Sequence, residues 1–177
     1  MEDGTEKNGE ITIAFETGHS SKDFINLYVN GKAEKVYTKN IKGYKIKDKY
    51  YVPRYIDLDG NGINYLLFVR RLTSEGSKIN LYELYQRNRG SNANGEDVYS
   101  YYISLPTHSR YEVWNVSSKY LVPRFDEKMS KIVADCPALA QKIQKHDKGY
   151  FYSQFALSDQ KKADVLKKII DEYNECK

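Results

Sequence analysis

Two cysteines are the residues of this chain whose type and spacing most directly suggest chemistry. Cys136 lies in the sequence Asp-Cys-Pro and Cys176 in Tyr-Asn-Glu-Cys, at the two borders of one segment with helical periodicity. A disulfide between them would close a loop of about 40 residues and stabilise the fold by roughly 4 kcal/mol. Two buried reduced thiols and a metal site are the alternatives. We predict the disulfide, because two cysteines with only His146 in the same segment form a poor metal site.

Such a disulfide would also indicate the compartment in which the protein works. Disulfides persist in exported proteins and are rare in the reducing cytosol. We therefore predict a periplasmic or outer-membrane-associated protein, with a cytosolic protein carrying two free thiols as the alternative. The N-terminus, Met-Glu-Asp-Gly-Thr-Glu-Lys, lacks the basic start and apolar centre of a signal peptide. No apolar run approaches the roughly 18 residues that span a bilayer, so we expect no transmembrane segment.

The sequence Asp-Leu-Asp-Gly-Asn-Gly at 57–62 has the alternating oxygen ligands of the first half of a calcium loop. The second half of the loop does not match a calcium site, because the twelfth position is Phe68 where a bidentate glutamate is required. We therefore predict a hairpin turn here, with Asp57, Asp59 and Asn61 as the only candidate metal ligands, and no cofactor.

Aromatic side chains on neighbouring strands form a candidate ligand-binding surface. Tyr101, Tyr111 and Trp114 would provide a stacking platform for a sugar or a base if their rings were exposed. Cross-strand aromatic pairs more often stabilise a sheet than bind a ligand. A glycan-binding domain is therefore an alternative function, and nucleic acid is not an expected partner.

No residue set predicts catalysis. The three histidines, His19, His108 and His146, lie far apart in polar contexts that are typical of surface loops. The chain contains no Gly-x-Ser-x-Gly, no His-Glu-x-x-His, no phosphate loop and no dinucleotide fingerprint. We predict no catalytic residue, although an enzyme of an unrecognised type remains an alternative.

The composition is typical of a folded domain with a mixed-charge surface. Hydrophobic residues make up 40% of the 177 positions, which is enough for a core. The 28 basic and 24 acidic residues give a formal net charge of +4 that is spread along the chain. A nucleic-acid-binding protein usually concentrates its positive charge on one stripe, and no such block occurs here.

The first two thirds of the chain predict an antiparallel β-meander. Of the 17 tyrosines, 14 lie before residue 125, in short runs with Ile, Val, Leu and Phe that favour strands. Asn-Gly pairs such as Asn30-Gly31 predict tight hairpins between them. The expected strands are 10–15, 24–29, 33–37, 41–46, 50–56, 63–70, 79–85, 98–105 and 110–116. Such a meander forms a curled sheet or a partly open barrel.

Helices follow from Pro123 onward. Phe125, Met129, Ile132 and Val133 have helical spacing, and Pro137 suits the first turn of a second helix. Ser158 is a good N-cap for a last helix, whose apolar stripe is Ala163, Leu166, Ile169, Ile170 and Tyr173. We expect its opposite face to be solvated, including Lys161, Lys162, Asp164, Lys168, Asp171 and Glu172.

The predicted fold class is therefore α+β, an antiparallel β-meander followed by a C-terminal helical cap. The predicted division is a flexible N-terminus at 1–9, the β region at 10–122 and a helical cap at 123–177 that packs on the sheet. We expect these parts to form a single structural domain.

The order of several segments resembles a family of uncharacterised exported proteins of Bacteroidetes. The resembling segments are Ile-Asn-Leu-Tyr-Val-Asn-Gly at 25–31, Asn-Ile-Lys-Gly-Tyr at 40–44 with Tyr50-Tyr51, Glu-Gly-Ser-Lys-Ile-Asn-Leu-Tyr at 75–82, Asp135-Cys136-Pro137, and Tyr173-Asn174-Glu175-Cys176. The resemblance implies a cell-envelope or periplasmic location, with a signal peptide before the domain, and it supplies no catalytic residues. Together with the cysteines and the aromatic sheet, it predicts a non-catalytic binding or interaction module with a protein or glycan partner in the envelope.

Overall fold

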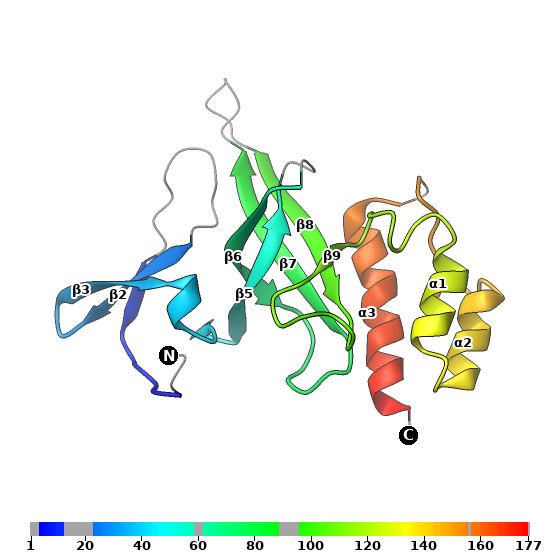
Figure 1. The fold of residues 1–177 in the computed structure, drawn as a ribbon, viewed down its shortest axis with the longest axis horizontal. Coiled ribbons are helices and arrows are strands. Elements are labelled where there is room, and N and C mark those ends of the chain that lie inside the picture. The colour runs from blue at the N-terminus through cyan, green and yellow to red at the C-terminus, as the bar shows by residue number, and fades with distance from the viewer. Residues whose placement is uncertain (1–3, 13–22, 59–61, 89–95, 156, 177) are drawn as a thin grey trace. The chain divides into compact units, whose positions relative to one another are not determined.

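A computed structural model describes residues 4–12, 23–58, 62–88, 96–155 and 157–176. The chain divides into two units, and strands β7 and β8 contribute residues to both (Figure 1). Unit 1 comprises Met1–Arg71, Glu83–Tyr99 and Ser109–Val113, and unit 2 comprises Leu72–Tyr82, Ser100–His108 and Trp114–Lys177. The predicted division at residues 10 and 123 stays a prediction.

The first strands form a three-stranded antiparallel sheet in the order β1-β2-β3. These strands are β1 (Glu10–Thr12), β2 (Phe24–Val29) and β3 (Lys32–Tyr37), and a short 3-10 turn, η1 (Thr38–Asn40), follows. Asn30 and Gly31 connect β2 to β3 with φ values of 51° and 75°. Both residues tolerate this left-handed conformation, so the predicted Asn-Gly hairpin is confirmed.

The second sheet has six strands in sequence order and is open rather than closed into a barrel. Its strands are β4 (Tyr44–Ile46), β5 (Lys49–Asp57), β6 (Asn64–Arg71), β7 (Asn80–Asn88), β8 (Glu96–Ser104) and β9 (Trp114–Asn115). The antiparallel register pairs Tyr50 with Arg71 and Asp57 with Asn64 across β5 and β6. The predicted meander is therefore present.

Two of the expected strands are shorter than predicted, and residues 13–15 of the expected strand at 10–15 lie outside the described residues. The expected strand at 41–46 begins only at Tyr44, and the one at 110–116 is reduced to Trp114–Asn115. Ile41 is nevertheless buried. Its apolar character reflects a place in the core of unit 1 rather than membership of a strand.

Unit 1 has a small apolar core between strands of its sheets. The residues of this core are Ile25, Leu27, Val36, Ile41, Tyr44 and Phe68. The Tyr44 ring stacks on Tyr51 at 4.8 Å between centroids and meets the edge of Phe68 at 4.9 Å. Burial of the Tyr44 side chain raises the pKa of its hydroxyl far above the ordinary value.

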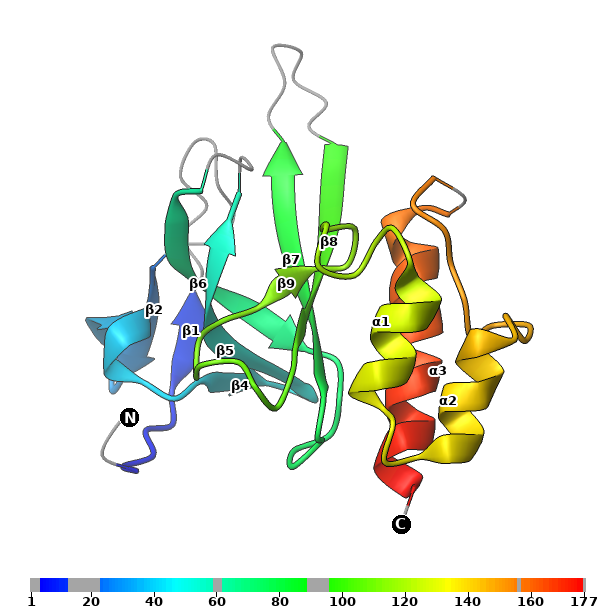
Figure 2. The same ribbon diagram turned by 45° about the vertical axis from the view of Figure 1, so that its right-hand side comes forward.

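Unit 2 contains the three helices α1 (Phe125–Ile132), α2 (Pro137–Gln144) and α3 (Asp159–Glu175), which Figure 2 shows from a second angle. Pro137 occupies the first turn of α2, and the Ser158 side chain accepts a hydrogen bond from the backbone N–H of Lys161 at the start of α3. These starting points agree with the sequence, because each residue satisfies or avoids an unpaired N–H at a helix end.

The helices of unit 2 enclose a larger core with the ends of β7 and β8. Leu166, Ile169 and Ile170 on α3 are fully buried and belong to one cluster with Leu139 on α2 and Tyr101 on β8. The apolar stripe of α3 is therefore the predicted one. The fold class is α+β, with open antiparallel sheets followed by C-terminal helices.

Candidate functional site

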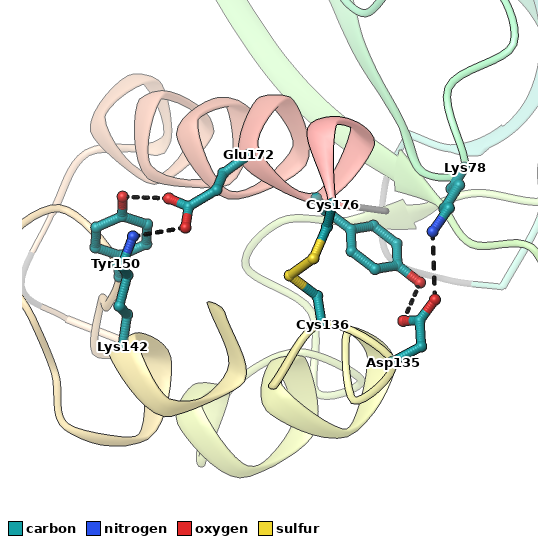
Figure 3. Close-up of a disulfide and its surroundings, with 8 residues drawn as sticks. Lys78, Asp135, Cys136, Lys142, Tyr150, Glu172 and Cys176 are labelled. Carbon is teal, nitrogen blue, oxygen red and sulfur yellow. Dashed lines mark hydrogen bonds and ion pairs between the residues drawn. A yellow bond between two sulfur atoms is a disulfide. The ribbon is translucent and has the colours of Figure 1, made fainter. Parts of the chain in front are cut away.

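Cys136 and Cys176 are joined by a disulfide in unit 2 (Figure 3). The S–S distance is 2.01 Å and the Cα atoms are 6.0 Å apart across 40 positions of sequence. Cys136 lies at the N-cap of α2 and Cys176 at the C-cap of α3, so the bond links the start of one helix to the end of another. Cys136 is only 3% exposed, and its sulfur is therefore shielded from solvent reductants.

A polar cluster beside the disulfide involves Asp135, which precedes the first cysteine. Its carboxylate accepts hydrogen bonds from the Tyr173 hydroxyl at 2.6 Å and from the Lys78 ammonium at 3.3 Å. The hydrogen bond from Tyr173 lowers the pKa of Asp135, and Lys78 adds to this effect. Burial, followed by the bond to Asp135, raises the pKa of Tyr173 to about 12. These bonds fix the end of α3 against the turn that precedes β7.

A second cluster involves Glu172, the residue before Tyr173, and joins α3 to α2 (Figure 3). Glu172 accepts hydrogen bonds from Lys142, at 2.6 Å, and from the Tyr150 hydroxyl. The Lys142 bond is the main reason that the pKa of Glu172 is lowered. The ammonium of Lys168 lies 4.0 Å from the centroid of the Tyr150 ring. The surroundings of the disulfide are therefore dense in structural contacts.

Lys162 is the one charged side chain among the buried polar residues that the structure describes, and its position corrects a prediction. Helical periodicity placed it on the solvated face of α3, but it is 5% exposed. Its ammonium donates hydrogen bonds to the Ser117 hydroxyl at 2.7 Å and to Asp159 at 3.3 Å. A buried cation is tolerated here because both groups compensate its lost hydration.

The same cluster contains a serine hydroxyl next to a lysine, which is a pairing that nucleophilic enzymes use. In such enzymes the lysine accepts the serine proton. Here the Ser117 hydroxyl donates to Asp159 at 2.6 Å, and Lys162 is the donor toward the serine. The arrangement suits a structural tie between the segment after β9 and the first turn of α3. The Asp159/Lys162 spacing was visible in the sequence, but Ser117 was too distant to connect to it.

The three predicted ligand-binding aromatics are divided between the two units and differ in burial. Tyr101 is 2% exposed, and its hydroxyl donates to Gln160. It belongs to the core cluster of unit 2, so its ring is not exposed as a stacking platform would require. Trp114, also in unit 2, is half-buried and stacks on Tyr120 at 4.7 Å. Tyr111 is half-buried in unit 1.

The candidate metal ligands are only partly visible. Asp59 and Asn61 lie outside the described residues, as does His19. The Asp57 carboxylate accepts a hydrogen bond from the backbone N–H of Gly62 at 2.9 Å, which is a typical turn contact. Among the residues that the structure describes, no three His, Cys, Asp or Glu side chains converge as a metal site would require.

A groove in unit 1 was not apparent from the sequence. Its volume is about 550 Å³, and both apolar and basic side chains line it. The apolar lining residues include Ile11, Ile25, Leu27, Val36 and Ile41, and the polar ones include Lys7, Lys42, Lys45 and Tyr50. Residues from four separate segments meet here, so no local motif could have revealed it.

The segment at 4–9 forms one wall of this groove. Lys7 holds it in place through an ion pair with Glu34 on β3, at 2.8 Å. Gly9 passes so close to β2 that a Cβ atom there would lie 2.3 Å from the Tyr28 carbonyl oxygen. Glycine is therefore required for this close approach.

Comparisons with known proteins found no matching family model, no similar curated protein and no similar solved structure. The resemblance to exported proteins of Bacteroidetes therefore stays a prediction. Within the part of the chain that the structure describes, no helix combines the length and apolar character needed to cross a bilayer.

Proposed function

We propose that this chain is an exported, non-catalytic binding or interaction module of the bacterial cell envelope. The observation that carries the proposal is the disulfide between Cys136 and Cys176. A bond that closes 40 positions of sequence stabilises only where thiols stay oxidised, and this favours a compartment outside the cytosol.

The groove of unit 1 supports a binding role. Its volume of about 550 Å³ lies within the range of small-molecule sites, roughly 300–1,000 Å³. A lining of apolar side chains, lysines and a tyrosine suits a ligand with an apolar body and polar or anionic substituents. An envelope glycan or a peptide segment of an envelope protein has this character.

Thiol trapping in intact cells of the source organism tests the export proposal. The cells are quenched in acid, and the protein is alkylated with and without reductant and analysed by mass. We expect both cysteines to be inaccessible to alkylation before reduction and accessible after it. Two alkylated cysteines in unreduced material would contradict the proposal, because a cytosolic protein would behave in that way.

A ligand screen tests the binding part. Wild-type protein is scanned by thermal shift against envelope glycans and peptides, alongside Lys42→Glu and the control Lys167→Glu, which lies on α3 in unit 2. A groove ligand should raise the melting temperature of the wild type and the control but not of Lys42→Glu. An equal shift in all three would place binding elsewhere.

The non-catalytic part has its own test, because Ser117 and Lys162 are adjacent. Wild type and Ser117→Ala are assayed on a broad panel of ester, amide and glycoside substrates. We expect no turnover by either protein. Turnover by the wild type that Ser117→Ala abolishes would show that the cluster is an active site.

A further inference from the structure

Two large apolar side chains are unusually exposed on the connecting segments of unit 2. Phe155, in the connection between α2 and α3, is 91% exposed, and Tyr120, between β9 and α1, is 52% exposed. No other large apolar side chain among the described residues exceeds Phe155 in exposure. An exposed phenylalanine is unfavourable in water, so its position suggests a partner that covers it.

The two connections meet at one end of the helical unit. The Tyr152 hydroxyl donates to the Val116 carbonyl at 2.9 Å, and the Ser117 hydroxyl donates to Asp159 at 2.6 Å. These bonds join residues on either side of Phe155 to the segment that leads to Tyr120. Figures 1 and 2 show both connections at the end where α1 and α3 begin.

The aromatic side chains at this end are firmly supported. Trp114 stacks on Tyr120 with an angle of 18° between the rings, and Trp114 itself packs against the core of unit 2. Tyr152, which anchors the Phe155 connection, is 1% exposed. The exposed Tyr120 ring is therefore held by its stacking on Trp114 and loses little conformational freedom when it is covered.

Three carboxylates at this end are engaged within the unit. Asp126 pairs with His146 at 3.0 Å, Glu127 with Arg124, and Asp159 with Lys162. Lys119 and Lys128 are two cations in the segment that leads to α1 and in α1 itself.

The positive charges of Lys119 and Lys128 are not paired in this way. The Lys128 ammonium donates to the Lys119 carbonyl at 2.8 Å, and the Lys119 ammonium lies 5.6 Å from the Tyr120 ring centroid. In the described part of the chain, neither lysine pairs with a carboxylate. The exposed aromatic rings are therefore accompanied by uncompensated positive charge.

We propose that this end of unit 2, defined by Phe155, Tyr120, Trp114, Lys119 and Lys128, docks on an anionic phospholipid surface. The Phe155 ring would enter the boundary of the acyl chains, and the amphipathic Tyr120 and Trp114 rings would lie at headgroup depth. The lysines would contact lipid phosphates, since each basic residue near an anionic membrane is attracted to it. This inference deepens the proposed binding role by naming one partner of the module.

The chemistry around Phe155 favours a lipid over a protein partner. A protein interface surrounds an aromatic anchor with further apolar residues that exclude water. Phe155 instead follows the exposed polar residues Ser153 and Gln154, and the segment that leads to Tyr120 includes the exposed Lys119. An isolated ring with basic neighbours suits shallow insertion between charged headgroups.

Vesicle co-sedimentation with the full, oxidised chain tests the proposal. Vesicles of phosphatidylcholine alone are compared with vesicles that also contain phosphatidylglycerol. We expect binding to the anionic vesicles, weaker binding when salt is added, and weaker binding to the neutral vesicles. Phe155→Ser should lower the partition coefficient about tenfold, and Lys119→Glu combined with Lys128→Glu should lower it further.

Tyr99→Ser is the matched control, because Tyr99 is an exposed aromatic residue of unit 1 at 46%. It should bind anionic vesicles as the wild type does. Circular dichroism checks that each variant is folded, which we expect because Phe155 contributes little to any core.

The proposal is overturned if the wild type does not bind anionic vesicles. It is also overturned if Phe155→Ser binds them as strongly as the wild type does. Crosslinking to an envelope protein that requires Phe155, without vesicle binding, would also overturn it and assign the surface to a protein. Neither result changes the redox state measured by thiol trapping, so failure here is distinguishable from failure of the export proposal.

Discussion

The tyrosines of the two units have different surroundings. In unit 2, Tyr101, Tyr152 and Tyr173 are at most 5% exposed, and each hydroxyl makes a hydrogen bond to a specific partner. In unit 1, Tyr55 and Tyr99 are 45% and 46% exposed. These three tyrosines of unit 2 thus close a core with a bonded polar end, and the two of unit 1 cover a sheet surface. Each unit also has a tyrosine of the other kind, the buried Tyr44 in unit 1 and the exposed Tyr120 in unit 2.

The two units also differ in covalent cross-linking. Unit 2 has the disulfide across its helix ends. Both cysteines of the chain lie in unit 2, and unit 1 contains none. Unit 1 depends on strand pairing and a small apolar cluster. The comparison implies that the disulfide and the bonded tyrosines of unit 2 contribute more to stability than the exposed Tyr55 and Tyr99 of unit 1.

Removal of the disulfide should have the largest effect on the stability of unit 2. Replacing Cys136 and Cys176 together by alanine, or reducing the wild type, should lower the free energy of unfolding of unit 2 by about 4 kcal/mol. Urea unfolding followed by far-ultraviolet circular dichroism, which reports mainly on the helices, measures this change. Reductant should not affect the double variant further. An unchanged midpoint for reduced wild type would contradict the prediction.

Tyrosine-to-phenylalanine substitutions sharpen the comparison at the level of single hydroxyls. Tyr152→Phe removes the donor to the Val116 carbonyl and leaves that buried oxygen unpaired, so it should cost about 1–2 kcal/mol of unfolding free energy. Tyr99→Phe changes an exposed hydroxyl and should stay within about 0.5 kcal/mol of the wild type. Denaturant unfolding of both variants provides the measurement, and equal losses would refute the contrast.

Alkaline pH should destabilise unit 2 through Tyr173. Its folded-state pKa is about 12, above the ordinary value near 10, so the folded state holds this proton more tightly. Its contribution is fully present below about pH 10 and is lost as the pH rises from about 10 to 12. Unfolding midpoints across this range should fall less steeply for Tyr173→Phe than for the wild type. Parallel curves would show that Tyr173 is not responsible.

Acidic pH should have the smallest effect, because Asp135 is exposed and Glu172 is only partly buried. Hydrogen bonds lower the pKa values of Asp135 and Glu172 in the folded state. The unfolded chain therefore binds more protons below about pH 4, and the stability of unit 2 falls as the pH is lowered through that region. Asp135→Asn should flatten this dependence, measured by thermal unfolding. The matched control, Asp171→Asn, should leave it in place.

Local signals made most of the fold predictable. The turn at Asn30 and Gly31, the cap at Ser158 and the proline at residue 137 each act within a few positions of sequence. Each also fixes a backbone conformation or satisfies a helix end. The apolar stripe of α3 followed from its period for the same reason. The cysteine pair was predictable because the chain contains no third cysteine.

The remaining features depend on contacts between distant residues. Lys162 lies on the face of α3 that its period assigns to solvent, and it is buried only because Ser117 and its segment cover it. The groove of unit 1 likewise arises where Lys7 draws one segment against Glu34 on another. Composition alone could not distinguish the buried Tyr101 from the exposed Tyr99, because the two residues share one strand and one alternation.

The disulfide and the exposed Phe155 together determine how the protein responds to a protease. Phe155 lies between Cys136 and Cys176, inside the covalent ring that the disulfide closes. A chymotrypsin-like cut at Phe155 would leave both fragments attached to each other. The nicked molecule would migrate as one band on a non-reducing gel and as two bands after reduction.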